Sequence, residues 1–209
     1  IQDLESALQD VWGRRLSSVF LGGGTPSLFS AGAMDAVLTA VRTLLPLEHF
    51  AEVTLEANPG TFEAQKFADF RKAGINRLSI GIQSFNPQHL KALGRAHDDQ
   101  EAHRAVDIAL KYFDNINLDL MYALPGQTLE HAQADIEAAC ACGVTHISAY
   151  HLTLEPNTLF YRFPPKLPDD EAAAEMQDMI EQTTSDHQYR NYETSAFARA
   201  GKESRHNVN

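Results

Sequence analysis

Five short apolar runs alternate along this chain with amphipathic stretches of helical length, and this alternation limits the fold more than any other feature. The apolar runs fall at residues 17–21, 52–56, 77–82, 116–121 and 146–150. Strands that alternate with helices of about 10–15 residues form βαβ units around a parallel sheet. The right-handed crossovers of such units leave two arrangements open, a doubly wound open sheet and a barrel-like curve.

Capping residues and apolar spacing place the helices between these strands. Helices are predicted over residues 2–12, 30–45, 61–74, 98–110, 128–140 and 169–186, with a short one beginning at residue 86. We expect Val37 and Leu38 on a buried helix face, and Thr61 as the cap of a helix that buries Phe62 and Phe67. A proline-rich connection after residue 152 leads to the last helix and to a short strand near residues 189–193.

The composition excludes several classes of protein. Of 209 residues, 44% are hydrophobic and 22% are charged, as in an ordinary globular domain. The net charge of −11 disfavours nonspecific binding to nucleic acid. No run approaches the ~18 apolar residues of a membrane-spanning helix, and the first residues carry no basic signal region. We therefore expect a cytoplasmic protein with no membrane span.

The chain contains two cysteines, Cys140 and Cys142, at the end of a predicted helix that runs into Gly143. Two cysteines one residue apart cannot hold an iron–sulfur cluster or a zinc ion unaided. A free cysteine in such a place usually behaves as a small apolar side chain. We expect reduced, structural thiols and no metal site made by this chain.

The first predicted strand ends in Gly22, Gly23 and Gly24, followed by Thr25 and Pro26. Glycine reaches positive φ freely and lets the backbone approach a ligand without a Cβ atom in the way. The segment is therefore either a tight turn from strand to helix or a main-chain cradle for a small polar ligand.

Four later strands also end in polar or charged side chains, and the carboxyl ends of parallel strands meet at one rim. Glu56 and Asp119 could accept hydrogen bonds from an amine or a ribose diol. Gln83 could bond a sugar hydroxyl or a base, and Arg95 could clamp a carboxylate. Taken singly, each carboxylate could instead cap a helix or form a salt bridge. Their joint occurrence favours one ligand site at the rim.

Four segments carry a resemblance to a known family: 22–27 (GGGTPS), 55–60 (LEANPG), 79–85 (SIGIQSF) and 117–128 (NLDLMYALPGQT). In this order they resemble the radical SAM proteins related to oxygen-independent coproporphyrinogen III oxidase, and in particular the heme chaperone (HemW) branch. The resemblance covers nearly the whole chain. It implies a partial TIM-like (β/α)6 barrel over residues 1–152, lacking its first strand. A linker and the start of a smaller α+β domain would occupy residues 153–209.

The resemblance also implies ligands. S-adenosylmethionine would lie across the strand ends, with its amino group held by four residues: Gly23, Gly24, Thr25 and Glu56. Arg95 would meet its carboxylate, while Gln83 and Asp119 would hold its ribose. Segment 206–209 resembles the start of an H-N-x-x-Y motif associated with heme, which makes His206 the candidate axial ligand; otherwise it is a solvated terminal histidine.

The chain departs from the family in its cysteines. The family holds a [4Fe–4S] cluster on a C-x3-C-x2-C loop, and residues 1–209 contain no such loop. We expect the cluster ligands upstream of Ile1, in a segment that was truncated or disordered, and no radical activity from these residues alone. Ser204 stands where many relatives carry cysteine.

The resemblance leaves three functions open. The first is a heme chaperone that passes heme to a recipient protein, which the segments 155–158 and 206–209 favour. The second is an oxygen-independent coproporphyrinogen III oxidase, a radical enzyme of porphyrin biosynthesis. The third is a cluster-free binding module. The rim residues do not separate the first two, because both share the barrel.

Overall fold

One seven-stranded sheet runs through residues 1–61 and 63–208, which the computed structural model describes. The strand order is β1-β2-β3-β4-β5-β7-β6. Strands β1 to β5 are parallel, and the hairpin of β6 and β7 continues the sheet antiparallel to β5. The strand bounds are Leu16–Leu21, Leu47–Ala57, Arg77–Gln83, Ile116–Tyr122, His146–His151, Arg190–Glu193 and Ala196–Ala198.

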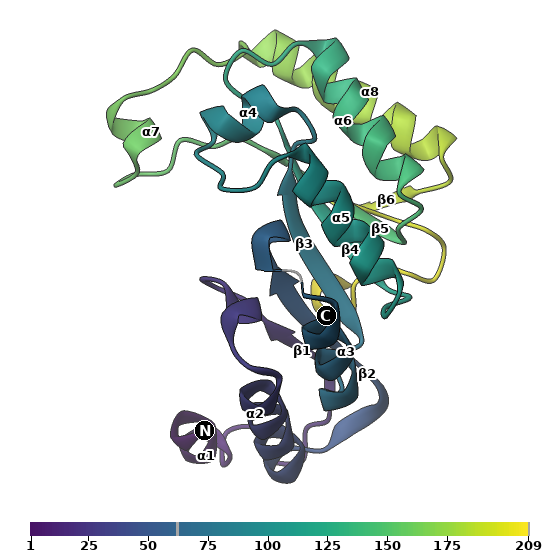
Figure 1. Ribbon diagram of the computed structural model, residues 1–209. Helices are drawn as coiled ribbons and strands as arrows, with labels where there is room; N and C mark the ends of the chain where they lie inside the picture. The colour runs from purple at the N-terminus through teal and green to yellow at the C-terminus, as the bar shows by residue number, and fades with distance from the viewer. Residues whose placement is uncertain (62, 209) are drawn as a thin grey trace.

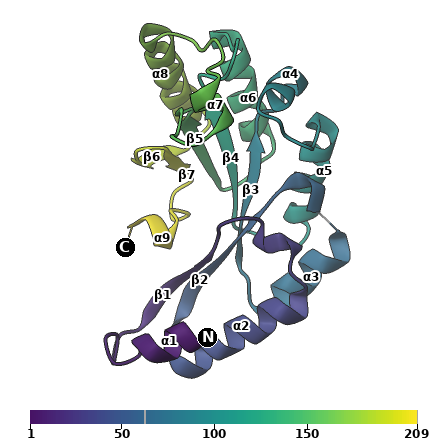
Figure 2. The ribbon, with the colours of Figure 1, turned by 90° about the vertical axis from the view of Figure 1, so that its left-hand side faces the viewer.

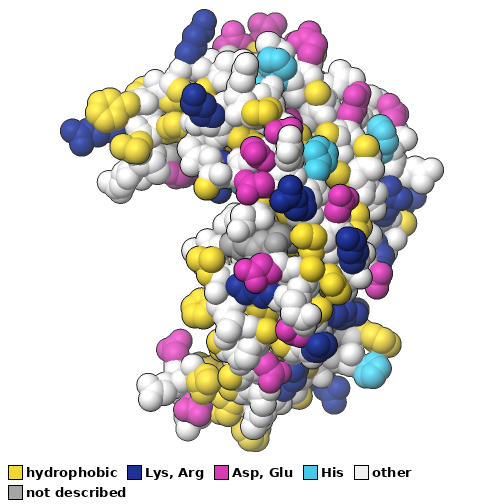
Figure 3. Space-filling view, viewed as in Figure 1, with side chains coloured by type: hydrophobic (Ala, Val, Ile, Leu, Met, Phe, Trp, Pro, Cys, Tyr) yellow, Lys and Arg dark blue, Asp and Glu magenta, His cyan; other side chains and the backbone are white. Residues whose placement is uncertain are grey.

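The parallel strands lie in the order of the chain, so each crossover returns its helix to the same side of the sheet. A doubly wound sheet needs a reversal of strand order, which is absent between β1 and β5. The sheet therefore curves like part of a barrel, with α2 (Ala31–Leu44), α3 (Ala64–Ala73), α5 (Asp99–Leu110) and α6 (Leu129–Ala141) on its outer side (Figures 1 and 2). The result is a crescent that is hollowed along one side (Figure 3).

The described residues form further helices besides these four. These are α1 (Gln2–Ala7), α4 (Pro87–Ala92), α7 (Leu159–Arg162), α8 (Asp170–Asp186) and α9 (Arg205–Val208), with short 3-10 turns η1 (Pro26–Leu28) and η2 (Pro59–Thr61). Helix α8 packs along α6, and α7 projects on a loop toward the hollow side (Figure 1).

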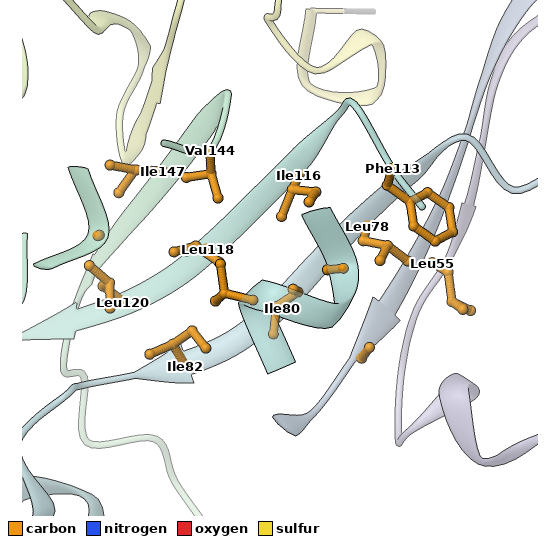
Figure 4. Packing of buried hydrophobic residues seen from close by; sticks show 14 of the residues in the cluster. Leu55, Leu78, Ile80, Ile82, Phe113, Ile116, Leu118, Leu120, Val144 and Ile147 are labelled. Atoms are coloured by element: carbon orange, nitrogen blue, oxygen red, sulfur yellow. The ribbon is translucent and has the colours of Figure 1, made fainter. Parts of the chain in front are cut away.

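The two faces of the sheet differ sharply in chemistry because side chains alternate along each strand. One face packs against the helices and is apolar; its fully buried residues include Leu55, Leu78, Ile80, Leu118 and Ile147 (Figure 4). The residues between them point into the hollow and are mostly polar: Thr54, Glu56, Ser79, Asn117, Asp119 and Ser148. The inner face is thus available for a polar ligand.

Side-chain caps fix most helix starts at the predicted residues. The Ser30 hydroxyl accepts the amide of Ala33, and Asp98 and Thr128 each form a capping box. The Asp169 side chain caps α8 by accepting the amide of Ala172. Gly74 ends α3 with a φ of 103°, as expected of a glycine in that place.

Several local predictions were wrong. The first helix ends at Ala7 instead of residue 12, and none of its residues is buried, so packing does not extend it. Helix α3 begins after Glu63, so its N-cap position is Glu63 and not Thr61, which lies in η2; Phe62 falls outside the described residues. Val37 is 40% exposed while Leu38 is buried, because Met34 and Leu38 form the apolar stripe of α2.

The two cysteines behave as predicted. Cys140 and Cys142 are free, and Cys140 is buried in the core between the sheet and the helices. Burial raises the pKa of the Cys140 thiol to about 11. Across the described part of the chain, no helix has the length and apolar character needed to cross a membrane.

Candidate functional site

A cleft of about 240 Å³ lies at the carboxyl ends of strands β1 to β4, on the hollow side of the sheet. Its lining residues are Gly24, Thr25, Pro26, Glu56, Ala57, Asn58, Ser79, Gly81, Gln83, Arg95 and Asp119. Six of the eight residues predicted to bind cofactors line this cleft. Gly23 adjoins it, and His206 is the exception.

The glycine loop after β1 has a conformation that other residues avoid. Gly23 and Gly24 have φ angles of 81° and 65°, in the left-handed region. The Gly23 amide donates to Oε2 of Glu56 at 3.0 Å. A Cβ atom on Gly22 would lie 3.1 Å from the Glu56 carboxyl carbon. The loop is therefore a tight turn that also brings bare backbone against the carboxylate.

A side-chain hydrogen bond joins the η1 side of the cleft to the end of β2. Asn58 lies two residues after Glu56 and donates from Nδ2 to the Thr25 hydroxyl at 3.2 Å. This bond ties the glycine loop to the end of β2. The hydroxyl and the carboxylate thus face the same cavity from neighbouring strands.

Gln83 ends β3 in an unusual state. Its φ is 65°, and the pairing of β3 with β4 shifts by one residue between Gly81 and Gln83. Gly81 makes room for this bend, because a Cβ atom there would lie 2.7 Å from Nε2 of Gln83. The Gln83 side chain is buried, and within residues 1–61 and 63–208 nothing donates to its Oε1. A buried acceptor without a donor is costly, so this atom suits a ligand hydroxyl or amine.

Asp119 lies at the floor of the cleft on β4. Its Oδ2 accepts the Ser79 hydroxyl at 2.8 Å, and its Oδ1 accepts Nδ2 of Asn117 at 2.8 Å. Burial raises the pKa of Asp119 from its ordinary 3.8 to about 6, against the opposing effect of these two donors and of the Arg77 charge. A carboxylate has about four acceptor positions, so two remain for hydroxyl groups of a ligand.

Arg95 follows α4 and lines the same cleft as Glu56 and Asp119. In the described part of the chain it forms no ion pair. Glu56 and Asp119 supply negative charge, and Arg95 supplies a planar cation. The cleft can thus bind one molecule that carries an ammonium group, a carboxylate and adjacent hydroxyls.

His206 lies outside the cleft but beside it. It is exposed on α9, and its ring stacks on Phe20 of β1 with ring centroids 4.6 Å apart. The Phe20 ring in turn borders Gly22, since its Cε1 atom would lie 2.7 Å from a Cβ atom there. The structure thus places the predicted heme ligand on the inner face next to the glycine loop.

The sequence did not single out Asn58, Ser79 and Gly81 as parts of the site. Asn58 lies two residues beyond Glu56, just past the end of β2, while Gly81 and Ser79 lie two and four residues before Gln83 on β3. The two-residue period of a strand, applied backward and forward from those residues, would have found them.

The side chains that bind metal ions in proteins do not cluster as the cleft residues do, among the residues that the structure describes. Among the described residues, no cluster of three or more His, Cys, Asp or Glu side chains could hold a metal ion. Cys140 is buried on the helix side of the sheet, away from the cleft.

Known proteins resemble this chain in sequence. It is 47% identical over 210 residues to the heme chaperone HemW of Escherichia coli (strain K12), and 47% identical over 214 residues to that of Haemophilus influenzae. Both matches cover all of this chain and 56% of the relative, so the chain spans about half their length. The mitochondrial radical S-adenosyl methionine domain-containing protein 1 of Danio rerio is 40% identical over 199 residues, which cover 93% of this chain and 45% of that protein.

Known structures resemble its fold. Coproporphyrinogen III oxidase (HemN) from Escherichia coli, described as a radical SAM enzyme, superposes with a TM-score of 0.85 at 23% identity, over 97% of this chain and 48% of that one. The archaeal Elp3 of Methanocaldococcus infernus follows with a TM-score of 0.66 at 16% identity. The model of the radical SAM superfamily matches residues 1–139. The chain belongs to the radical SAM superfamily.

Proposed function

We propose that this chain binds S-adenosylmethionine in the strand-end cleft and forms the nucleoside-binding half of a heme chaperone. The observation that carries the proposal is the cleft itself, which combines two carboxylates with a guanidinium and a Gln83 Oε1 that have no ion-pair or donor partner among residues 1–61 and 63–208. S-adenosylmethionine offers the complementary groups, an ammonium, a carboxylate, a ribose diol and an adenine amine. The similarity to heme chaperones supports the second part of the proposal.

The donors and acceptors of the cleft suggest one orientation of the ligand. The Glu56 carboxylate, held by the Gly23 amide, accepts from the ligand ammonium beside Gly24 and Thr25. Arg95 pairs with the ligand carboxylate. The ribose hydroxyls donate to Asp119 and to Oε1 of Gln83, which satisfies the buried acceptor.

The proposal that the protein binds heme and passes it to a recipient rests on the similarity to heme chaperones alone. His206 is the residue of this chain proposed to ligate heme, and it is exposed enough to be reached. A [4Fe–4S] cluster is proposed for the intact relatives of this superfamily, but its ligands do not lie in residues 1–209. The oxidase alternative is supported only by a likeness at 23% identity, which concerns the fold.

The cleft is tested by comparing two ligands in an NMR titration of backbone amides. 5′-Methylthioadenosine shares the nucleoside of S-adenosylmethionine but lacks its aminocarboxypropyl group and its sulfonium charge. Arg95→Ala should weaken S-adenosylmethionine by about 10-fold or more, the scale of a charged hydrogen bond, and leave methylthioadenosine unchanged. Asp119→Ala should weaken both ligands by about 1–3 kcal/mol.

The matched controls are Arg104→Ala and Asp107→Ala, exposed residues of α5 on the outer side of the sheet. They should bind both ligands as the unaltered chain does. If the Arg95 and Asp119 variants bind S-adenosylmethionine as tightly as the unaltered chain does, the proposed site is wrong. For heme, His206→Ala should lose the Soret shift seen on hemin addition, while His49→Ala keeps it.

A further inference from the structure

A chain of polar side chains, of which Asn117 and His146 are buried, leads from the floor of the cleft across the inner face of the sheet. Asn117 donates from Nδ2 to Asp119 at 2.8 Å, and its Oδ1 lies 2.6 Å from Nδ1 of His146. Nε2 of His146 lies 2.7 Å from the hydroxyl of Tyr192. That hydroxyl also accepts from the Ser204 amide at 3.1 Å and from Nδ2 of Asn207 at 3.2 Å. Three strands and α9 are thus joined by one hydrogen-bonded path, named here the relay.

The direction of every bond in the relay is fixed by its end at Asp119. An ionised carboxylate only accepts, so the nitrogen of the Asn117 amide must face it and the oxygen must face His146. Nδ1 of His146 therefore carries the proton. Burial lowers the pKa of His146 to about 3, so the ring is neutral and Nε2 is an acceptor for the Tyr192 hydroxyl. All the donors point from α9 toward the cleft.

The far end of the relay lies in the segment that carries the candidate heme ligand. Asn207 follows His206 in α9, and the His206 ring stacks on Phe20 beside the glycine loop. The polar path and the aromatic contact thus tie the same short helix to two sides of one cleft. Hydrogen bonds in a chain polarise one another, so a change at Asp119 alters the bonds further along.

We propose that His146 and Tyr192 are positioning residues that couple occupancy of the cleft to the placement of the His206–Asn207 segment. The proposal rests on the function proposed above, because it takes the nucleoside as the ligand of Asp119. Ribose hydroxyls would donate to the same Asp119 carboxylate as Asn117 and Ser79, and this would weaken the bonds that those two residues donate. The change passes along the relay and alters the strength of the hydrogen bond between Tyr192 and Asn207. By linkage, the position of α9 changes the affinity of the cleft by the same factor.

The first test reads the tautomer of His146 in the unaltered chain by long-range 1H–15N NMR. The relay requires a proton on Nδ1 and a bare Nε2. A proton on Nε2 would overturn the proposal, whatever the variants do. This arm needs no ligand and no substitution.

The second test removes the Tyr192 hydroxyl and keeps its ring. Tyr189→Phe is the matched control, because the Tyr189 hydroxyl also forms a hydrogen bond inside the fold but donates to the Val144 carbonyl, outside the relay. S-adenosylmethionine should shift the Asn207 side-chain amide in the unaltered chain and in Tyr189→Phe. In Tyr192→Phe that shift should be lost, and the affinity should fall by about 2- to 10-fold. An Asn207 shift that persists in Tyr192→Phe, or is absent from the unaltered chain, would overturn the coupling.

The same spectra separate this proposal from the proposed function. If S-adenosylmethionine leaves the amides of Gly24 and Gly81 unmoved, the ligand assignment fails. The relay is then tested with Asp119→Asn and no ligand. This substitution should shift the NMR signal of the Asn207 side-chain amide when Tyr192 is present, and should leave it unchanged when Tyr192→Phe is added. Equal effects in both backgrounds would refute the relay.

Discussion

Asp119→Asn tests the electrostatics of the cleft floor through stability. The folded pKa of about 6 lies about two pH units above the ordinary 3.8, so the ionised carboxylate destabilises the fold. Each pH unit corresponds to about 1.4 kcal/mol, which gives an upper limit of about 3 kcal/mol. Asp119 is half-buried in an open cleft, and solvent screening reduces the expected penalty to about 1–2 kcal/mol.

The sign of the pH dependence follows from proton uptake. Between pH 3.8 and about 6 the folded state binds more protons than the unfolded state, so this carboxyl makes the protein more stable as the pH falls. Asparagine keeps the local bonds, since its oxygen accepts from Asn117 and its nitrogen can donate to the Ser79 hydroxyl. Asp119→Asn should therefore gain about 1–2 kcal/mol at pH 8 and almost nothing at pH 4.

Urea unfolding at the two pH values measures the effect. Asp114→Asn is the matched control, an exposed aspartate just before β4, and should change stability equally at both pH values. A variant that is less stable than the unaltered chain at pH 8, or whose gain is the same at pH 4, would refute the reasoning. The same variant should bind S-adenosylmethionine more weakly, because it lacks the carboxylate that accepts from the ribose hydroxyls. The Asp119 charge would then lower stability and strengthen ligand binding.

Three further substitutions probe other parts of the account. Gly22→Ala places a Cβ atom 3.1 Å from the Glu56 carboxyl carbon, so we expect weaker S-adenosylmethionine binding in a folded protein; an unchanged Kd would contradict it. Asp135→Ala removes the acceptor of the Ser84 hydroxyl and the Phe85 amide, both at 2.7 Å, and should cost about 2–4 kcal/mol in urea unfolding; a loss under about 0.5 would argue against the contact. Leu118→Ala, in the middle of β4, should cost about 2–5 kcal/mol, and a smaller loss would mean that the core is loosely packed there.

The parallel sheet and most helix starts follow from local sequence. Ser30, Asp98, Thr128 and Asp169 each cap the predicted helix, because a side-chain cap needs only residues one turn away. Strand β6 confirms the strand predicted near residues 189–193, but β7 was not predicted, since it is three residues long and is placed by its pairing with β5 and β6. Its pairing depends on tertiary contact and not on its own pattern.

The site shows the same division. Glu56, Gln83 and Asp119 could be predicted because strand ends meet at one rim. The left-handed Gln83 and its orphan acceptor could not, because they arise from the irregular pairing beside Gly81. Tyr192 contacts His146 of β5 and Asn207 of α9, which lie 46 and 15 residues away in the sequence. No spacing rule predicts contacts of this kind. The boundary near residue 152 between barrel and extension stays a prediction.

A crystal structure of this chain with S-adenosylmethionine would test the central claim most directly. We expect the ligand carboxylate at Arg95, the ammonium at Glu56, and the ribose hydroxyls within hydrogen-bonding distance of Asp119 and of Oε1 of Gln83. A ligand bound in another cleft, or one lying in this cleft with its ribose turned away from Asp119, would contradict the account.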